Sequence, residues 1–134
     1  MFLAHRCHIG GGCAGYAVIY LSKEQRDKPH LTTWHGMLGV TTLSYVLLQA
    51  CAGVNLLYPQ LVARYVRLGV LKQLHATSGL LLTLLATLTL LTAMFSDWFI
   101  KAVTGTSWYA CLACPVLLLL IIMNQVKNAY LAKG

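Results

Sequence analysis

Two histidines in this chain each stand four residues before a glycine. They occur in His35-Gly-Met-Leu-Gly39 and in His75-Ala-Thr-Ser-Gly79. Residues i and i+4 share one face of a helix, so each imidazole would project beside a patch without a side chain. A flat macrocycle needs such a patch, and haem iron is commonly held by axial histidine. The spacing therefore indicates haem-iron ligation by the two histidines, with the two glycines lining the cofactor.

A second interpretation of the same residues stays open. Glycines at these positions also allow helices to pack closely, and a lone polar side chain in a membrane often bonds to a neighbouring helix. Against this, an ionisable residue within a membrane span is costly and is commonly functional. The spacing alone does not decide between ligation and packing.

The elements that carry the histidines are long and apolar. Hydrophobic residues make up 58% of the 134 residues and charged residues only 10%, and the mean hydropathy is +0.69. A soluble domain would have about a quarter of its residues charged, and a membrane span needs about 20 apolar ones. We predict an all-α membrane protein, one transmembrane domain over 1–134, forming a bundle of about four helices at 7–21, 33–57, 71–95 and 107–125.

The basic residues give the expected orientation. Four spans place both termini and the 57–72 connection on one side, with six basic residues against four on the other side. This difference favours a cytoplasmic C-terminus in a multi-pass protein. The cations are spread through the loops without a dense run, so the expected partner is the lipid bilayer and not a nucleic acid.

This topology separates the two histidines. The helices at 33–57 and 71–95 are antiparallel, so His35 and His75 should lie near opposite membrane faces and cannot ligate the same iron. His8, which has Gly12 at i+4, shares a side with His75 and is a candidate partner. His30 lies on the side of His35 but before the helix start, where we expect an interfacial residue.

Several separated motifs resemble the cytochrome b561 family, especially its cytochrome b561 domain-containing members. They cover roughly 17–134 and are HLTTWHGMLG, LYPQL, LKQLHATSGL, VTGTSWY and CPVLLLLIIMNQVKNAYL. The resemblance implies a six-helix electron carrier with two b haems. It also implies an ascorbate-dependent transmembrane oxidoreductase of the ferric reductase type. Such a protein takes electrons from cytoplasmic ascorbate and reduces monodehydroascorbate or ferric iron on the other side.

On this resemblance, the four predicted helices correspond to the last four of the six-helix core. His35 then matches the ligand of the non-cytoplasmic haem, and His75 matches the ligand of the cytoplasmic haem. The first two helices have no counterpart, so we expect a truncated, alternatively spliced or mispredicted product. Aligning without a gap puts the third-helix ligand at about Met1, and His8 is a ligand only if residues were deleted. We therefore expect one haem b or none to bind, where the intact family binds two.

The resemblance also suggests partners. Arg64, Arg67 and Lys72 stand near His75 and could attract anionic ascorbate, although they also serve the positive-inside pattern. A second copy of the chain could supply the missing helices, which would make the protein a homodimer. The expected location is a vesicle, endoplasmic reticulum or plasma membrane. Two other functions stay open: a non-redox membrane subunit that packs through its glycine faces, and a cation or proton pathway lined by histidine and threonine.

Overall fold

The predicted all-α class is confirmed. The structure is a computed structural model that describes the backbone of residues 2–62 and 64–131 and the side chains of 11–62 and 64–130. All regular structure in these ranges is helical. In chain order the helices are α1 (Phe2–Glu24), α2 (Trp34–Leu57), a 3₁₀ turn (Pro59–Leu61), α3 (Leu68–Met94), α4 (Asp97–Ala102), α5 (Thr106–Val126) and a π-helical turn (Lys127–Leu131).

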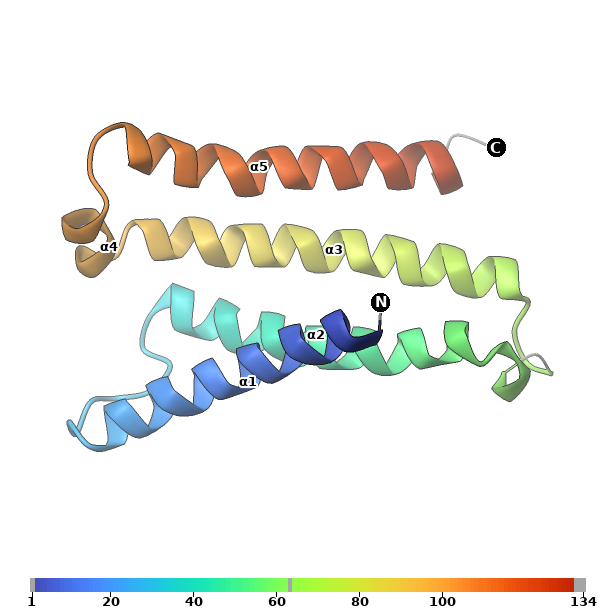
Figure 1. Cartoon of the computed structure of the whole chain (residues 1–134), viewed down its shortest axis with the longest axis horizontal. Helices are drawn as coiled ribbons and strands as arrows, with labels where there is room; N and C mark the ends of the chain where they lie inside the picture. The colour runs from blue at the N-terminus through green and yellow to red at the C-terminus, as the bar shows by residue number, and fades with distance from the viewer. Residues whose placement is uncertain (1, 63, 132–134) are drawn as a thin grey trace.

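The four long helices run in alternating directions. Helix α3 lies between α2 and α5 and packs against both, while α1 crosses α2 (Figure 1). The N-terminal end of α1, the α2–α3 connection and the C-terminal end of α5 lie toward one end of the bundle, called here the basic end. The α1–α2 connection and α4 lie at the other end, called the mixed-charge end.

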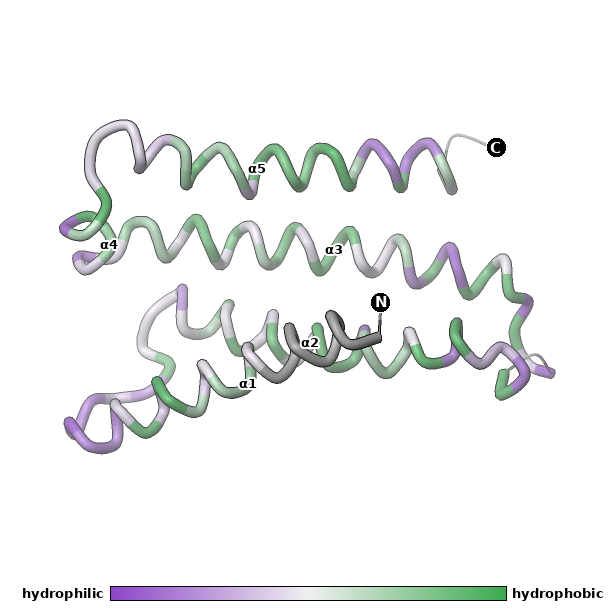
Figure 2. The backbone as a smooth tube through the Cα atoms, in the orientation of Figure 1, coloured by the Kyte–Doolittle hydropathy of each residue, from purple (hydrophilic) through white to green (hydrophobic). Residues whose placement is uncertain are grey.

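Three of the helices are long and apolar enough to cross a membrane. They are Trp34–Leu57, Leu68–Met94 and the helical segment Thr106–Tyr130. In α3 and α5 the most hydrophilic stretch lies toward one end of the helix (Figure 2). Most of their apolar side chains are exposed, which suits contact with hydrocarbon. The fourth predicted span, 7–21, falls partly outside the described side chains. The chain is thus an all-α membrane bundle.

Buried side chains mark α3 as the centre of this bundle. Among the described residues, three of the four that are buried lie on α3, namely Thr87, Thr89 and Met94, and the fourth is Val126 of α5. Two of these are threonines, so the tightest part of the bundle is partly polar. Helices in membranes use such small polar residues for close packing and for bonds between helices.

The helix starts place His35 as expected and His75 deeper in its helix than expected. Thr33 caps α2, where its hydroxyl accepts a hydrogen bond from the Gly36 N–H at 3.1 Å. His35 is therefore in the first turn of α2, as predicted. Helix α3 begins at Leu68, three residues before the predicted start, because Arg67 is the last residue in an extended conformation. His75 consequently lies about two turns into α3, whereas a start at 71 would have placed it about one turn in.

Candidate functional site

The imidazole of His35 is held by a backbone carbonyl on the neighbouring helix. Its Nδ1 lies 3.0 Å from the carbonyl oxygen of Thr89 on α3. A carbonyl oxygen only accepts, so Nδ1 carries the proton and Nε2 keeps its lone pair. Metal-binding histidines are usually fixed in this way, with the second ring nitrogen donating to a carbonyl or carboxylate. His35 thus fits the role of an axial ligand to haem iron.

His75 is set differently, between α2 and α3. Its Nδ1 is buried and has no hydrogen-bond partner within the described part of the chain. The Cε1 edge of the ring faces Gly53 on α2, where a Cβ would lie only 3.3 Å from that carbon. A buried polar atom without a partner is costly, which makes this nitrogen a candidate for a further interaction. His75 therefore also fits the role of a ligand.

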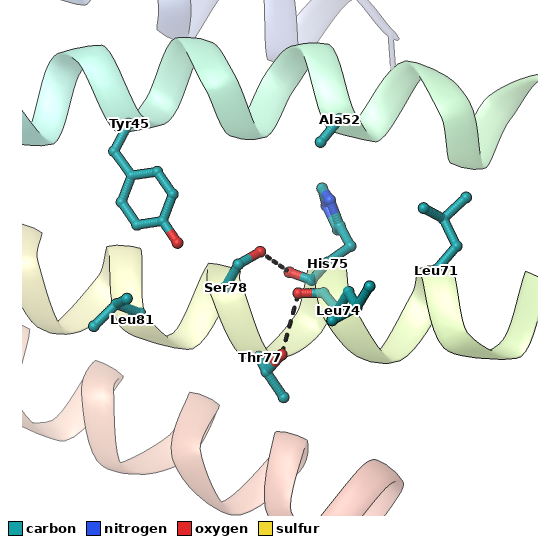
Figure 3. A pocket seen from close by; sticks show the side chains of 8 residues that line it. All are labelled: Tyr45, Ala52, Leu71, Leu74, His75, Thr77, Ser78 and Leu81. Carbon is teal, nitrogen blue, oxygen red and sulfur yellow. Dashed lines mark hydrogen bonds between the residues drawn. The ribbon is translucent and has the colours of Figure 1, made fainter. Parts of the chain in front are cut away.

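An open hollow of about 490 Å³ adjoins His75. Figure 3 shows the ring standing between the two helices, beside Ala52, with the hydroxyl of Tyr45 pointing toward α3. The lining is mostly apolar and consists of Tyr45, Ala52, Leu71, Leu74, His75, Thr77, Ser78 and Leu81. Cofactor sites are typically apolar hollows with a few placed polar groups, and this hollow has that character.

Both glycines of the histidine motifs face the helix opposite. A Cβ on Gly39 would lie 3.8 Å from Cγ2 of Thr89, and one on Gly79 would lie 3.2 Å from Nε2 of Gln49. These contacts belong to the packing of α2 against α3, which is the second interpretation that the sequence left open. The seating of a porphyrin against the same glycines stays a prediction.

The two histidines are far apart along the bundle. His75 lies beside Gly53, which is 18 residues after His35 on α2. At a rise of 1.5 Å per residue the separation along the helix is about 27 Å. This is close to the roughly 30 Å thickness of a bilayer core, so the two imidazoles suit sites near opposite membrane faces.

Sequence reasoning missed the polar side chains that brace these histidines. Gln49 of α2 bonds to the backbone of His75 and to Ser78, and the hydroxyl of Thr42 lies 2.9 Å from that of Thr89. The available signal was a single glutamine inside a 24-residue apolar helix. A polar side chain at such a depth is expected to have a partner on another helix.

The remaining predicted residues lie near the ends of the bundle. Arg64, Arg67 and Lys72 are exposed, and Lys72 precedes His75 by about one turn on α3. His30 lies at the other end, with Nε2 at 2.9 Å from Glu24 Oε1. The predicted ligand His8 lies outside the described side chains.

Charge separates the two ends of the bundle. All three carboxylates of the chain belong to the mixed-charge end, as Glu24, Asp27 and Asp97. The described residues of the basic end therefore carry cations alone. An anion would be attracted to the described cations of that end, and a cation to the acidic side chains of the other.

Fold and site together define a class of protein, a helical membrane bundle with an imidazole near each face. Within the described side chains no three His, Cys, Asp or Glu residues gather as a metal site. Axial haem ligation needs only one or two imidazoles for each iron. An imidazole near each face is an arrangement that haem ligation can use.

Comparison with known proteins identifies the family. A family model described as eukaryotic cytochrome b561 matches residues 2–100, so the chain belongs to this family. It is 50% identical to transmembrane reductase CYB561D2 of mouse and of human, over 94% of the chain and 60% of each relative. It is 41% identical to human probable transmembrane reductase CYB561D1, over 89% of the chain and 52% of the relative. No solved structure matches the chain.

The chain spans about 60% of the length of the first of these relatives. Their names describe reductases that act across a membrane, which agrees with the class drawn from the fold.

Proposed function

We propose that this chain is part of a transmembrane electron carrier in which His35 and His75 each bind the iron of a haem b. The observation that carries the proposal is the bond from His35 Nδ1 to the Thr89 carbonyl, because it leaves Nε2 free to ligate. The buried and unpartnered Nδ1 of His75 beside an apolar hollow supports a second site. Family membership and the named reductase relatives support electron transfer as the activity.

Haem b would supply a one-electron couple at each site when bound. The residues of the chain would hold it at fixed depth, exclude water with apolar side chains and keep each imidazole oriented. A site with two axial imidazoles has no open iron position and is suited to electron transfer without oxygen chemistry. His8 remains the proposed partner of His75, and one haem or none would bind if the second ligands are missing.

We further propose cytoplasmic ascorbate as the electron donor, acting at the basic end. Arg64, Arg67 and Lys72 would attract this anion beside the site of His75. Ascorbate would lose one electron and one proton and become monodehydroascorbate. At the mixed-charge end, monodehydroascorbate would gain one electron and one proton, or ferric iron would gain one electron.

The absorption spectrum of the purified chain tests the haem assignment. We expect Soret and α bands typical of a b-type haem, which ascorbate reduces. A folded but colourless protein would falsify the assignment for this chain and would favour a non-redox membrane subunit or an ion pathway. Haem per chain, measured as the pyridine complex, then separates one site from two.

The orientation is tested separately. We propose that the basic end faces the cytoplasm of a vesicle, endoplasmic reticulum or plasma membrane. Single cysteines placed at Arg64 and at Lys28, in a chain whose native cysteines are changed to serine, are then labelled in intact and opened vesicles with an impermeant maleimide. In vesicles whose cytoplasmic face points outward, we expect the cysteine at position 64 to be labelled before opening and the cysteine at position 28 only after opening. The opposite labelling pattern would reverse the proposed direction of electron flow.

A further inference from the structure

Gln49 of α2 is bonded to the turn of α3 that carries His75. Its Nε2 donates to the carbonyl oxygen of His75 at 2.7 Å, and its Oε1 accepts from the Ser78 hydroxyl at 2.8 Å. The same hydroxyl lies 3.1 Å from the His75 carbonyl oxygen. Because a carbonyl only accepts, the orientation of the Gln49 amide is fixed by these partners. One side chain therefore ties two groups of one helical turn to α2.

Two glycines allow α2 and α3 to approach closely at the turn that carries His75. A Cβ on Gly79 would lie 3.2 Å from Nε2 of Gln49, so the amide rests on a helix face without a side chain. Gly53 lies one turn beyond Gln49 on the same face of α2. A Cβ at this position would lie 3.3 Å from Cε1 of His75. The backbone of His75 is thus held by Gln49, and the position of its ring is restricted by Gly53, one turn further along α2.

We propose that Gln49 and Gly53 are positioning residues that fix the depth and the ring orientation of His75. This role rests on the proposed function, because orientation matters for a ligand. Gln49 fixes the position of the α3 backbone along α2 through its bond to the His75 carbonyl. Gly53 leaves room for the Cε1 edge of the His75 ring, which a side chain at this position would displace. The bonds that Gln49 makes are to the backbone of His75 and to Ser78, so neither ring nitrogen of His75 is bonded to Gln49.

The first test needs no haem. The chain, labelled with ¹³C and ¹⁵N in histidine and placed in lipid nanodiscs, is compared by NMR with Gln49→Met, which keeps the side-chain length and removes both bonds. The His75 signals, assigned with His75→Ala, should form one narrow set in the original chain and at least two sets, or a broadened one, in Gln49→Met. An unchanged His75 signal in Gln49→Met overturns the proposal.

Matched variants separate positioning from general loss of packing. Gln73→Met changes an exposed glutamine two residues before His75 and should leave the signals unchanged. Gly53→Ala should shift the ring signals, whereas Gly69→Ala, where no atom lies within 4 Å of a new Cβ, should not. If Gln49→Met fails to fold, the Gly53 and Gly69 pair decides, and equal spectra for these two variants overturn the proposal.

The second test uses haem binding and distinguishes the two proposals. In a His35→Ala background, which isolates the site of His75, hemin titration should show affinity about tenfold weaker in Gln49→Met, as is typical when the support of a metal ligand is lost. The low-spin electron paramagnetic resonance signal should also broaden. Haem binding that Gln49→Met leaves unchanged overturns the positioning role alone. A chain that binds no haem, with His75 signals that still respond, overturns the proposed function alone.

Discussion

The same His-x-x-x-Gly spacing is braced in opposite ways at the two ends of the bundle. At the mixed-charge end, α3 supplies a carbonyl, and the ring of His35 donates to it. At the basic end, α2 supplies the Gln49 amide, which binds the carbonyl of His75 and leaves its ring without a bond to Gln49. In both motifs the glycine faces the element that provides the brace.

This difference shows what the repeated spacing encodes. A glycine four residues after the histidine clears one patch of helix surface, where the opposite helix packs: a methyl group of Thr89 faces Gly39, and the Gln49 amide faces Gly79. A polar group of the opposite helix then bonds to the histidine close to this patch. Where the polar group is a carbonyl, it fixes the tautomer of the imidazole; where it is an amide, it can fix only the backbone. The contacts are looser at Gly39, at 3.8 Å, than at Gly79, at 3.2 Å. The two ends should therefore respond differently to matched substitutions.

The largest expected effect follows removal of each imidazole. His35→Ala and His75→Ala should each abolish the haem absorbance of one site, because a metal centre that loses an axial ligand loses most of its binding energy. Since the sites lie about 27 Å apart, the effects should be additive. His30→Ala, which removes the partner of Glu24, is the control and should leave haem content unchanged. Loss of all haem from each of the two single variants would mean that the two ends are not separate sites.

The sequence predicted the position of α2 closely and the polar contacts between helices poorly. Helix α2 was expected at 33–57 and occurs at Trp34–Leu57, because Thr33 is a recognisable cap. The start of α3 was missed by three residues because Arg67 makes no side-chain cap that a pattern could reveal. The short helix α4 was not predicted, although Ser96 caps it.

The histidines and glycines were recognisable because their spacing lies within one helix. The partners of these residues were not, since Gln49 and His75 are 26 residues apart and meet only through tertiary packing. Nothing in a single apolar helix indicates which of its faces will meet a neighbour. A lone polar residue in a span therefore signals that a partner exists without naming it.

The second-largest expected effect is a difference in stability between alanine substitutions at the two motif glycines, Gly79 and Gly39. Gly79→Ala should destabilise the chain by about 1–2 kcal/mol, because the new methyl group presses on an amide held by two hydrogen bonds. Gly39→Ala meets only ordinary contact and should be neutral, or more stable by up to about 1 kcal/mol through helix propensity. Unfolding in mixed micelles with increasing sodium dodecyl sulfate, followed by circular dichroism, measures both. Equal losses at the two positions would contradict the proposed difference between the motifs.

A smaller effect is expected from the charges that separate the ends. Lys72→Glu should raise the half-saturating ascorbate concentration about fivefold, because it replaces attraction for an anion with repulsion next to His75. The rise should be smaller at high salt, since exposed charges are screened. Lys101→Glu, at the opposite end, is the matched control and should leave this concentration unchanged. Equal effects of the two variants would show that ascorbate does not act at the basic end.

The smallest effect concerns the hydroxyl pair that accompanies the brace of His35. Thr42→Val removes the bond between the Thr42 and Thr89 hydroxyls at 2.9 Å and keeps the side-chain shape. Its cost should be about 0.6 kcal/mol, a typical value for a hydrogen bond between membrane helices. Thr41→Val is the control, because the Thr41 hydroxyl donates to the Met37 carbonyl of its own helix, as the Thr42 hydroxyl also does to Leu38. The carbonyl of Thr89 remains in place in Thr42→Val, so the haem spectrum of the His35 site should not change. A spectral change as large as that of Gln49→Met at the other end would mean that His35 also depends on a side-chain brace, and the contrast between the two motifs would no longer hold.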